Sequence, residues 1–190
     1  MIFFDDKKVF EIKDQNIFLD NDFLGILFEN EEFFPEFLEI FPQVLFLIDP
    51  LTAFEFMRDI FIPKQRELRE RFIYNDKIFT IAPNHHENFE AIQKNALLLS
   101  KICSHKNIKS NPGIVDLFLA GRVMIYADNT ILVTSNQKHF PRFLFDVVSV
   151  LNYVDEQSEN TRTFYFLKFN KGKFSNCYIL LDKVGKEDKK

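Results

Sequence analysis

Acidic side chains recur in this sequence where apolar segments end or are interrupted. Asp20 directly follows the apolar run 17–19, and Asp22 comes two residues later. A short apolar run between polar flanks is typical of a strand buried on both faces of a parallel sheet. Because an unpaired ionised carboxylate is very costly to bury, Asp20 is expected to mark the carboxyl end of that strand. This is the edge at which open α/β sheets place their ligand sites.

Two further acids and one amide are predicted to reach the same edge. Glu55 falls within the first two turns of a helix expected to start at Pro50, directly after an apolar strand. Asp116 interrupts the apolar face of a later helix, and Asn136 follows another apolar strand. Several carboxylates at one edge would repel one another without a cation, and Mg²⁺ or Mn²⁺ are hard ions that prefer oxygen ligands. A metal ion in such a site can activate water and stabilise an in-line phosphoryl transition state.

Strands and helices are expected to alternate along the chain, which predicts an α/β domain with a mainly parallel sheet. The apolar and β-rich segments predict strands at 17–19, 44–48, 78–82, 131–133, 143–154 and 164–169, with a short strand within 1–13. Helical spacing and helix-start signals predict helices at 23–28, 35–41, from 50, from 63, at 87–104, from 111 and over 174–181. We therefore predict a three-layer α/β/α sandwich. It forms one domain over 1–190, with a core at about 16–145, a C-terminal strand and helix at 146–184 and a tail at 185–190.

The composition limits the kinds of partner. A chain of 190 residues that is 46% hydrophobic can bury a sizeable core as one domain. The formal net charge of −4 gives no overall attraction to nucleic acid or to an anionic membrane, so an RNA site would have to be a local basic patch. The candidates are the charged segment 64–71, for which a solvated face with ion pairs is favoured, and the basic cluster at 101–109.

Several observations suit a cytoplasmic location. Cys103 and Cys177 show no metal or redox spacing, as expected in a reducing compartment. No apolar run approaches the ~18 residues of a membrane span, so no membrane partner is expected. The amino terminus has no cationic start and no long apolar core, which argues against a signal peptide.

Four short motifs resemble, in order, those of the PIN domain, the nuclease fold of the VapC-type toxins. They are NIFLDNDFL around Asp20, PLTAFEF around Glu55, NPGIVDLFLAG around Asp116 and ILVTSNQKHFP around Asn136. The separations of 35, 61 and 20 residues between these four positions suit that family. The resemblance covers roughly residues 16 to 145 and implies a PIN-like fold.

The resemblance also implies roles for the site residues. Asp20, Glu55 and Asp116 would be the core metal ligands for Mg²⁺ or Mn²⁺, and Asn136 takes the position of a fourth acid. An amide lacks the charge of a carboxylate, so a second metal would bind more weakly there. The substrate-binding candidates are Thr134, Asp22 and His139. The implied activity is metal-dependent endoribonuclease cleavage of RNA. As a toxin, the protein would have an antitoxin partner that covers the site, and it would form a homodimer.

Two other functions fit the same residues. One is a PIN module with a weak or inactive site that binds RNA or a protein partner. The other is a haloacid-dehalogenase-type phosphatase, because FLDNDFLG contains Asp-x-Asp, with Asp20 as nucleophile and Asp22 as acid. That superfamily also needs a downstream Lys and paired acids, for which we find no convincing match after Asn136.

A histidine pair invites a zinc interpretation that we disfavour. His85 and His86 are followed by Glu87, but adjacent residues point apart on a helix and no third ligand has suitable spacing. A loop or helix-start role is favoured for this pair. For His139, a surface loop role is slightly favoured over a role as a base or phosphate contact near Asn136.

Overall fold

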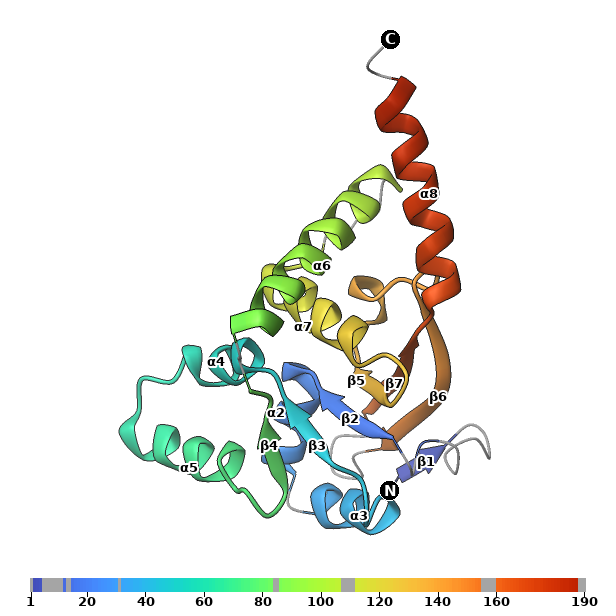
Figure 1. Ribbon diagram of the computed structural model, residues 1–190. Helices are drawn as coiled ribbons and strands as arrows, with labels where there is room; N and C mark the ends of the chain where they lie inside the picture. The colour runs from blue at the N-terminus through green and yellow to red at the C-terminus, as the bar shows by residue number, and fades with distance from the viewer. Residues whose placement is uncertain are drawn as a thin grey trace.

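The computed structural model describes residues 2–4, 12, 15–30, 32–83, 86–106, 112–154 and 160–187. It is an α/β fold (Figure 1). The strands are β1 (Ile2–Phe4), β2 (Asn16–Leu19), β3 (Phe46–Ile48), β4 (Phe79–Ile81), β5 (Thr130–Thr134), β6 (Phe145–Val154) and β7 (Thr161–Phe169). The helices are α2 (Asn21–Glu29), α3 (Phe33–Ile40), α4 (Pro50–Arg58), α5 (Pro63–Ile73), α6 (His86–His105), α7 (Ile114–Ile125), the 3₁₀ turn η1 (Gln137–His139) and α8 (Lys171–Glu187).

The described strands form one sheet in the order β1-β6-β7-β5-β2-β3-β4. Its second half is parallel: β5 pairs with β2, β2 with β3 and β3 with β4, all in the same direction. From β2 the chain moves outward to β3 and β4 and then returns to β5 on the other side of β2. Parallel pairing of this kind was predicted from the alternation of apolar strands and helices.

The expectation of a mainly parallel sheet is wrong for the other half. β7 pairs antiparallel with β5, β6 with β7 and β1 with β6, so the sheet is mixed. The physical reason is the connection between β6 and β7. β6 ends at Val154 and β7 begins at Thr161, and a connection of six residues is too short for the crossover that parallel strands require, so the two consecutive strands pair as an antiparallel ribbon. The apolar pattern of 143–154 and 164–169 correctly predicts strands, but it does not specify their direction.

Helices cover both faces of the sheet. Along β2, Ile17 and Leu19 face one apolar cluster and Phe18 faces the other, as alternation in a strand requires. The first cluster includes buried residues of α2, α3, α4 and α5, and the second includes residues of α6, α7 and α8. Figure 1 shows α6, α7 and α8 gathered together, apart from α2 and α3. This arrangement is compatible with the predicted three-layer α/β/α sandwich.

Two helices start earlier than predicted, and in each an asparagine side chain upstream accepts a hydrogen bond from a backbone amide of the first turn. The Asn30 side chain accepts a hydrogen bond from the Phe33 amide at 2.9 Å, and α3 begins at Phe33 rather than at Pro35. The Asn170 side chain accepts from the Lys173 amide at 2.9 Å, and α8 begins at 171. α8 then continues through 187, so the predicted tail at 185–190 is helical over 185–187. In the described part of the chain, no helix is long and apolar enough to span a membrane.

Candidate functional site at the carboxyl edge of the sheet

The predicted acidic residues lie at the edge where β2 and β5 end. These two parallel strands are neighbours, yet the chain leaves them on opposite sides. α2 packs into the first apolar cluster, whereas Phe140, just after η1, packs into the second. Such a divergence is the topological switch point at which open α/β sheets bind ligands. Asp20 stands at the end of β2, and residues 134–136 stand at the end of β5.

Asp20 is held at this edge by both strands. It caps α2 with an extended backbone, and its Oδ1 accepts a hydrogen bond from the Asn21 amide at 2.8 Å. The Thr134 hydroxyl donates to its Oδ2 at 2.7 Å. Thr134 Oγ1 in turn accepts a hydrogen bond from the backbone amide of Asn136 at 2.9 Å. Asp20 is only 5% exposed and Thr134 is fully buried. Thr134 therefore fixes a nearly buried carboxylate and the loop after β5 with one hydroxyl.

Asp22, in the first turn of α2, reaches across to the same loop. Its Oδ2 accepts from the Ser135 amide at 2.8 Å and from the Ser135 hydroxyl. Its Oδ1 is buried and has no hydrogen-bond partner among the described residues. A buried oxygen without a partner is unusual in a folded protein and calls for a ligand, ion or water. Sequence reasoning did not identify Ser135, because a serine after a strand carries no specific signal.

Glu55 and Asp116 approach from two helices. α4 begins two residues after β3, so Glu55, in its second turn, remains near the carboxyl edge of the sheet. α7 precedes β5 and returns toward the start of that strand, so its amino end lies at the same edge. Asp116 is the third residue of α7. The pKa of Glu55 is raised by burial and then by the charge of Asp116, with a smaller effect from Asp22. The two helices therefore bring their carboxylates within electrostatic range of each other.

Asp116 is bound on one oxygen by two groups. The Gly113 amide donates to Oδ2 at 2.7 Å, and His139 Nδ1 lies 2.9 Å from the same oxygen. A side chain at position 113 would bring its Cβ to 3.0 Å from this oxygen, which favours glycine there. The side-chain amide nitrogen of Asn136, Nδ2, lies 2.8 Å from the same His139 Nδ1. If Nδ1–H donates to Asp116, Asn136 has to present its amide oxygen to it.

Burial and neighbouring carboxylates raise the pKa values of Asp20 and Asp22 as well as that of Glu55. Burial and the neighbouring charges of Asp22 and Asp116 raise the pKa of Asp20 to about 8, against the lowering effect of the Thr134 and Asn21 hydrogen bonds. Burial also raises the pKa of Asp22, with Asp116 adding a smaller repulsion. Desolvation and like charge are two of the causes that shift carboxyl groups in this direction. Four acids that were predicted to converge therefore interact electrostatically in the folded chain.

The oxygen atoms of these acids suit a hard divalent cation in chemistry and in charge, but their present arrangement does not form a metal site. All the candidate ligand atoms are carboxylate oxygens, their negative charges are close together, and Asp22 Oδ1 has no hydrogen-bond partner in the described chain. Among the residues that the structure describes, however, no group of three or more His, Cys, Asp or Glu side chains is arranged to hold a metal ion. Both oxygens of Asp20 and one of Asp116 are engaged by protein groups.

A buried ion pair positions the two helices that carry Glu55 and Asp116. Asp49, at the end of β3, caps α4 by accepting from the Leu51 amide at 2.8 Å. Its other oxygen accepts from Arg122 Nε of α7, and both side chains are 2% exposed. Arg122 also donates to the Pro83 carbonyl at 3.1 Å. The start of α4 at Pro50 was predicted from the sequence. The pairing of Asp49 with Arg122, 73 residues away, was not predicted, because an arginine in the last turns of a helix is ordinarily exposed.

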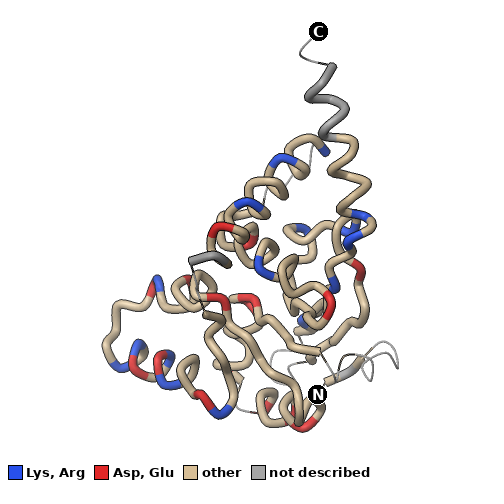
Figure 2. Tube along the Cα trace, viewed as in Figure 1, with Lys and Arg blue, Asp and Glu red and all other residues tan. Residues whose placement is uncertain are grey.

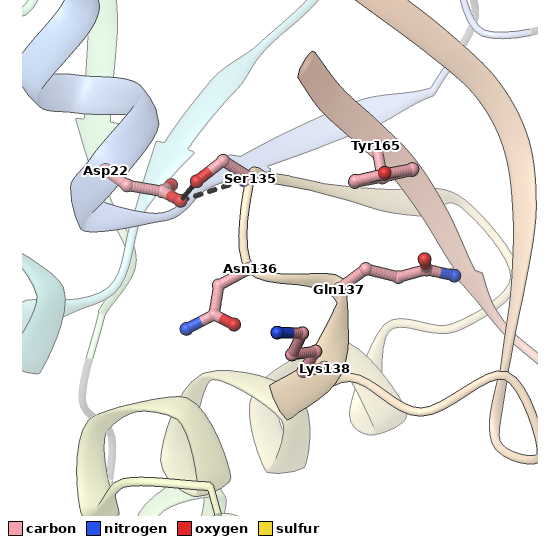
Figure 3. A pocket seen from close by; sticks show the side chains of 6 residues that line it. All are labelled: Asp22, Ser135, Asn136, Gln137, Lys138 and Tyr165. Atoms are coloured by element: carbon pink, nitrogen blue, oxygen red, sulfur yellow. Dashed lines mark hydrogen bonds between the residues drawn. The ribbon is translucent and has the colours of Figure 1, made fainter. Parts of the chain in front are cut away.

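A cavity of about 480 Å³ adjoins the acids (Figure 3). It is lined by Asp22, Ser135, Asn136, Gln137, Lys138 and Tyr165. Tyr165 of β7 is the partner of Thr134 of β5 in the antiparallel register, which places its ring beside the site. Gln137, Lys138 and Tyr165 were not predicted from the sequence. The stretch after Asn136 is rich in polar groups, but the position of Tyr165 follows only from strand pairing.

The two predicted basic patches do not gather at this edge. Along α5, basic and acidic residues alternate (Figure 2), and Arg66–Glu70 and Arg71–Glu67 form exposed ion pairs. This confirms the predicted solvated face. Lys101 and His105 lie at the carboxyl end of α6, which is beside α8 and away from α4 (Figure 1). Lys109, His85 and the side chains of His86 and Glu87 lie outside the described residues.

A scan of family models and searches of curated proteins and of solved structures found no match to this chain.

Proposed function

We propose that this protein is a metal-dependent endoribonuclease with a PIN-like fold, which hydrolyses phosphodiester bonds of RNA at the carboxyl edge of its sheet. In this proposal Asp20, Glu55 and Asp116 hold Mg²⁺ or Mn²⁺, Asp22 adds a fourth carboxylate and Asn136 completes the polar site. The proposal combines the four PIN-like motifs of the sequence with the geometry of the acids.

The observation that carries the proposal is the concentration of negative charge at one buried edge. Asp20, Asp22 and Asp116 are close enough that the pKa of Asp20 rises to about 8 through burial and their charges. Such a cluster destabilises the fold when it is ionised and alone, as the raised pKa values imply. A divalent cation removes that repulsion and provides a partner for Asp22 Oδ1, which has none in the described chain. When bound, the cation supplies positive charge that stabilises an in-line phosphoryl transition state.

The protein groups around the acids hold them for this task. Thr134 fixes Asp20 and Ser135 fixes Asp22, so the carboxylates are oriented before any ligand arrives. In this proposal His139, whose Nδ1 lies 2.9 Å from Asp116 Oδ2, contacts the substrate phosphate. Lys138, in the wall of the adjoining cavity, provides a cation for the RNA backbone. This local charge suits RNA better than the overall charge of −4 does.

Cleavage of a panel of structured and unstructured RNAs tests the proposal. The purified protein is incubated with Mn²⁺, with Mg²⁺ or with chelator. We expect metal-dependent cleavage that is lost in Asp20→Asn and in Asp116→Asn. Asp76→Asn is the matched control, because Asp76 is an exposed aspartate in the turn after α5. Cleavage that persists in both site variants, with their folds intact, would count decisively against these residues.

A second candidate is an RNA-binding PIN-like module without hydrolysis. The observation that favours it is the engagement of Asp116, whose Oδ2 contacts both the Gly113 amide and His139. This candidate predicts RNA binding in chelator and no cleavage with either metal. An antitoxin partner, a homodimer and a cytoplasmic location remain proposals that rest on the family resemblance and on the composition.

A further inference from the structure

The cavity beside the acids contains groups that the proposed hydrolysis does not use. Gln137, Lys138 and Tyr165 line its walls together with Asp22, Ser135 and Asn136. Figure 3 shows Gln137 and Tyr165 on the side of the cavity away from Asp22, and Asn136 and Lys138 close together. A volume of about 480 Å³ lies within the range of small-molecule pockets. The walls therefore surround a space beside the acids that is large enough for one organic group.

Two atoms of the lining residues lack partners within the described chain. Gln137 Nε2 is a buried donor and Asp22 Oδ1 a buried acceptor, and neither has a hydrogen-bond partner there. Buried polar groups without partners are rare in folded proteins because leaving them unpaired costs free energy. One belongs to the acidic side of the cavity and the other to the side that carries Tyr165. A ligand of this cavity has to offer an acceptor to Gln137, whereas Asp22 Oδ1 is left to the cation of the proposed function.

Tyr165 and Lys138 narrow the chemistry of that ligand. Tyr165 provides an aromatic ring, held by the pairing of β7 with β5 directly beside Thr134. Single-stranded RNA is recognised by stacking of splayed bases on such rings and by hydrogen bonds to base edges. Lys138 is exposed and provides a positive charge for a phosphate. An aromatic ring and an amide donor suit the base of a nucleotide, and a cation next to a candidate phosphodiester site suits its phosphate.

We infer that this cavity is a base-recognition subsite, which holds one nucleotide of single-stranded RNA next to the acidic site. Tyr165 stacks on the base, Gln137 Nε2 donates to an acceptor on the base edge, and Lys138 pairs with the phosphate. The inference rests on the proposed function for the identity of the ligand as RNA. It adds a source of sequence preference, because a donor at Gln137 discriminates among base edges whereas stacking alone does not.

Binding without cleavage tests the subsite. Labelled hexamers of A, C, G and U are titrated in chelator, so that binding is measured apart from hydrolysis. We expect Tyr165→Leu to weaken hexamer binding about tenfold, as stacking contributions suggest, while Tyr165→Phe stays near wild type. Tyr74→Leu is the matched control, because Tyr74 is exposed at the end of α5. Thermal unfolding checks that each variant is folded.

Gln137 and Lys138 give independent readings if Tyr165→Leu fails to fold. Gln137→Glu replaces the amide donor with an acceptor, so we expect the preference among the four hexamers to change, whereas Gln93→Glu on α6 leaves it unchanged. Lys138→Gln should weaken the binding of all four hexamers alike and reduce its salt dependence, because a phosphate contact does not depend on the identity of the base. Nucleoside 5′-monophosphates should compete with the preferred hexamer, but more weakly than the hexamer itself binds.

The outcomes separate this inference from the proposed function. Hexamer binding and base preference that are unchanged in Tyr165→Leu and Gln137→Glu would overturn the subsite, even if the wild type cleaves RNA. Tyr165-dependent binding without cleavage would support the subsite and contradict the hydrolase. Monophosphates that bind as tightly as hexamers would assign the cavity to free nucleotides and overturn its assignment to RNA. Absence of both binding and cleavage would contradict both proposals.

Discussion

Asp20→Asn is expected to change how the stability of the metal-free protein depends on pH. The substitution removes a carboxylate that is nearly buried and lies near Asp22 and Asp116, while it keeps an oxygen that can accept from the Asn21 amide. Burial and those two charges raise the pKa of Asp20 from 3.8 to about 8. The folded state therefore holds a proton on Asp20 over a range of pH in which the unfolded chain has released it.

The sign and size of the effect follow from proton linkage. Between pH 4 and pH 8 the folded state binds more protons than the unfolded state, so the free energy of unfolding falls as pH rises. Asp20 contributes at most about 1.4 kcal/mol per pH unit to this slope, and at most about 3 kcal/mol between pH 5 and pH 7. The raised pKa values of Asp22 and Glu55 act in the same direction, so the comparison with Asp20→Asn isolates the contribution of Asp20. Asp146 does not interfere in this window. The Lys173 hydrogen bond lowers the pKa of Asp146. Protonation of Asp146 therefore reduces the stability of the fold only below about pH 4.

Urea denaturation in chelator at pH 5, 6, 7, 8 and 9 measures this dependence. We expect the wild type to lose stability across the series and Asp20→Asn to lose less, so that the variant becomes the more stable protein near pH 8. Asp76→Asn should follow the wild type, since Asp76 is exposed. Parallel curves for wild type and Asp20→Asn would refute the reasoning, because they would mean that Asp20 ionises alike in the folded and unfolded states.

A bound cation should oppose the same loss. A ligand that binds only the folded state increases the free energy of unfolding. Once the ligand concentration exceeds the dissociation constant, this increase grows with the logarithm of their ratio. At pH 8, where about half of the Asp20 carboxyl groups are ionised, Mn²⁺ should therefore raise the urea midpoint of the wild type more than at pH 5, where Asp20 is protonated. The increase should shrink in Asp20→Asn. An equal shift in both proteins at both pH values would place any Mn²⁺ effect outside the acidic edge.

Two further predictions concern the helices that carry the acids. Asp49→Ala leaves Arg122 without its buried carboxylate and should lower the free energy of unfolding by about 3–5 kcal/mol in urea denaturation, whereas a loss under 1 kcal/mol would contradict a structural role for the pair. Gly121→Ala should lower the free energy of unfolding by about 1–3 kcal/mol in the same assay, because its Cβ would lie 2.8 Å from the Ile92 carbonyl oxygen and push α7 away from α6. The matched control is Gly25→Ala, where the added Cβ meets nothing within 4 Å.

The ends of the parallel strands were predictable from the sequence because the relevant physics is local. Asp20 cannot continue a buried strand, and Asp49 followed by Pro50 is a helix start, so both mark where a strand stops and a helix begins. Parallel strands that alternate with helices place such positions at one edge. The positions of Asp20 and Glu55 at that edge follow from these local signals, whereas Asp116 was chosen because it interrupts an apolar helix face and matches a PIN-like motif.

The antiparallel half of the sheet was not predictable in the same way. The apolar patterns of β6 and β7 indicate strands, but their direction depends on which neighbours they meet. That pairing puts Tyr165 beside Thr134, although the two residues are far apart in the sequence. Ser135 and Gln137 were missed for a related reason. Ser135 matters because it donates to Asp22, and Gln137 because its Nε2 has no hydrogen-bond partner among the described residues. Neither property can be seen in residue type or spacing.

The buried ion pair links the architecture of the core to the geometry of the candidate site. Asp49 fixes the start of α4 from the end of β3, and Arg122 fixes α7 against the same carboxylate and against the Pro83 carbonyl. Glu55 lies six residues after Asp49 and Asp116 six residues before Arg122, so each site acid is less than two helical turns from the pair. The separation of the two acids is therefore set by a contact that water does not reach, rather than by loops. Such a site can hold repelling carboxylates together, because the helices that carry them are fixed independently of the charges at their ends.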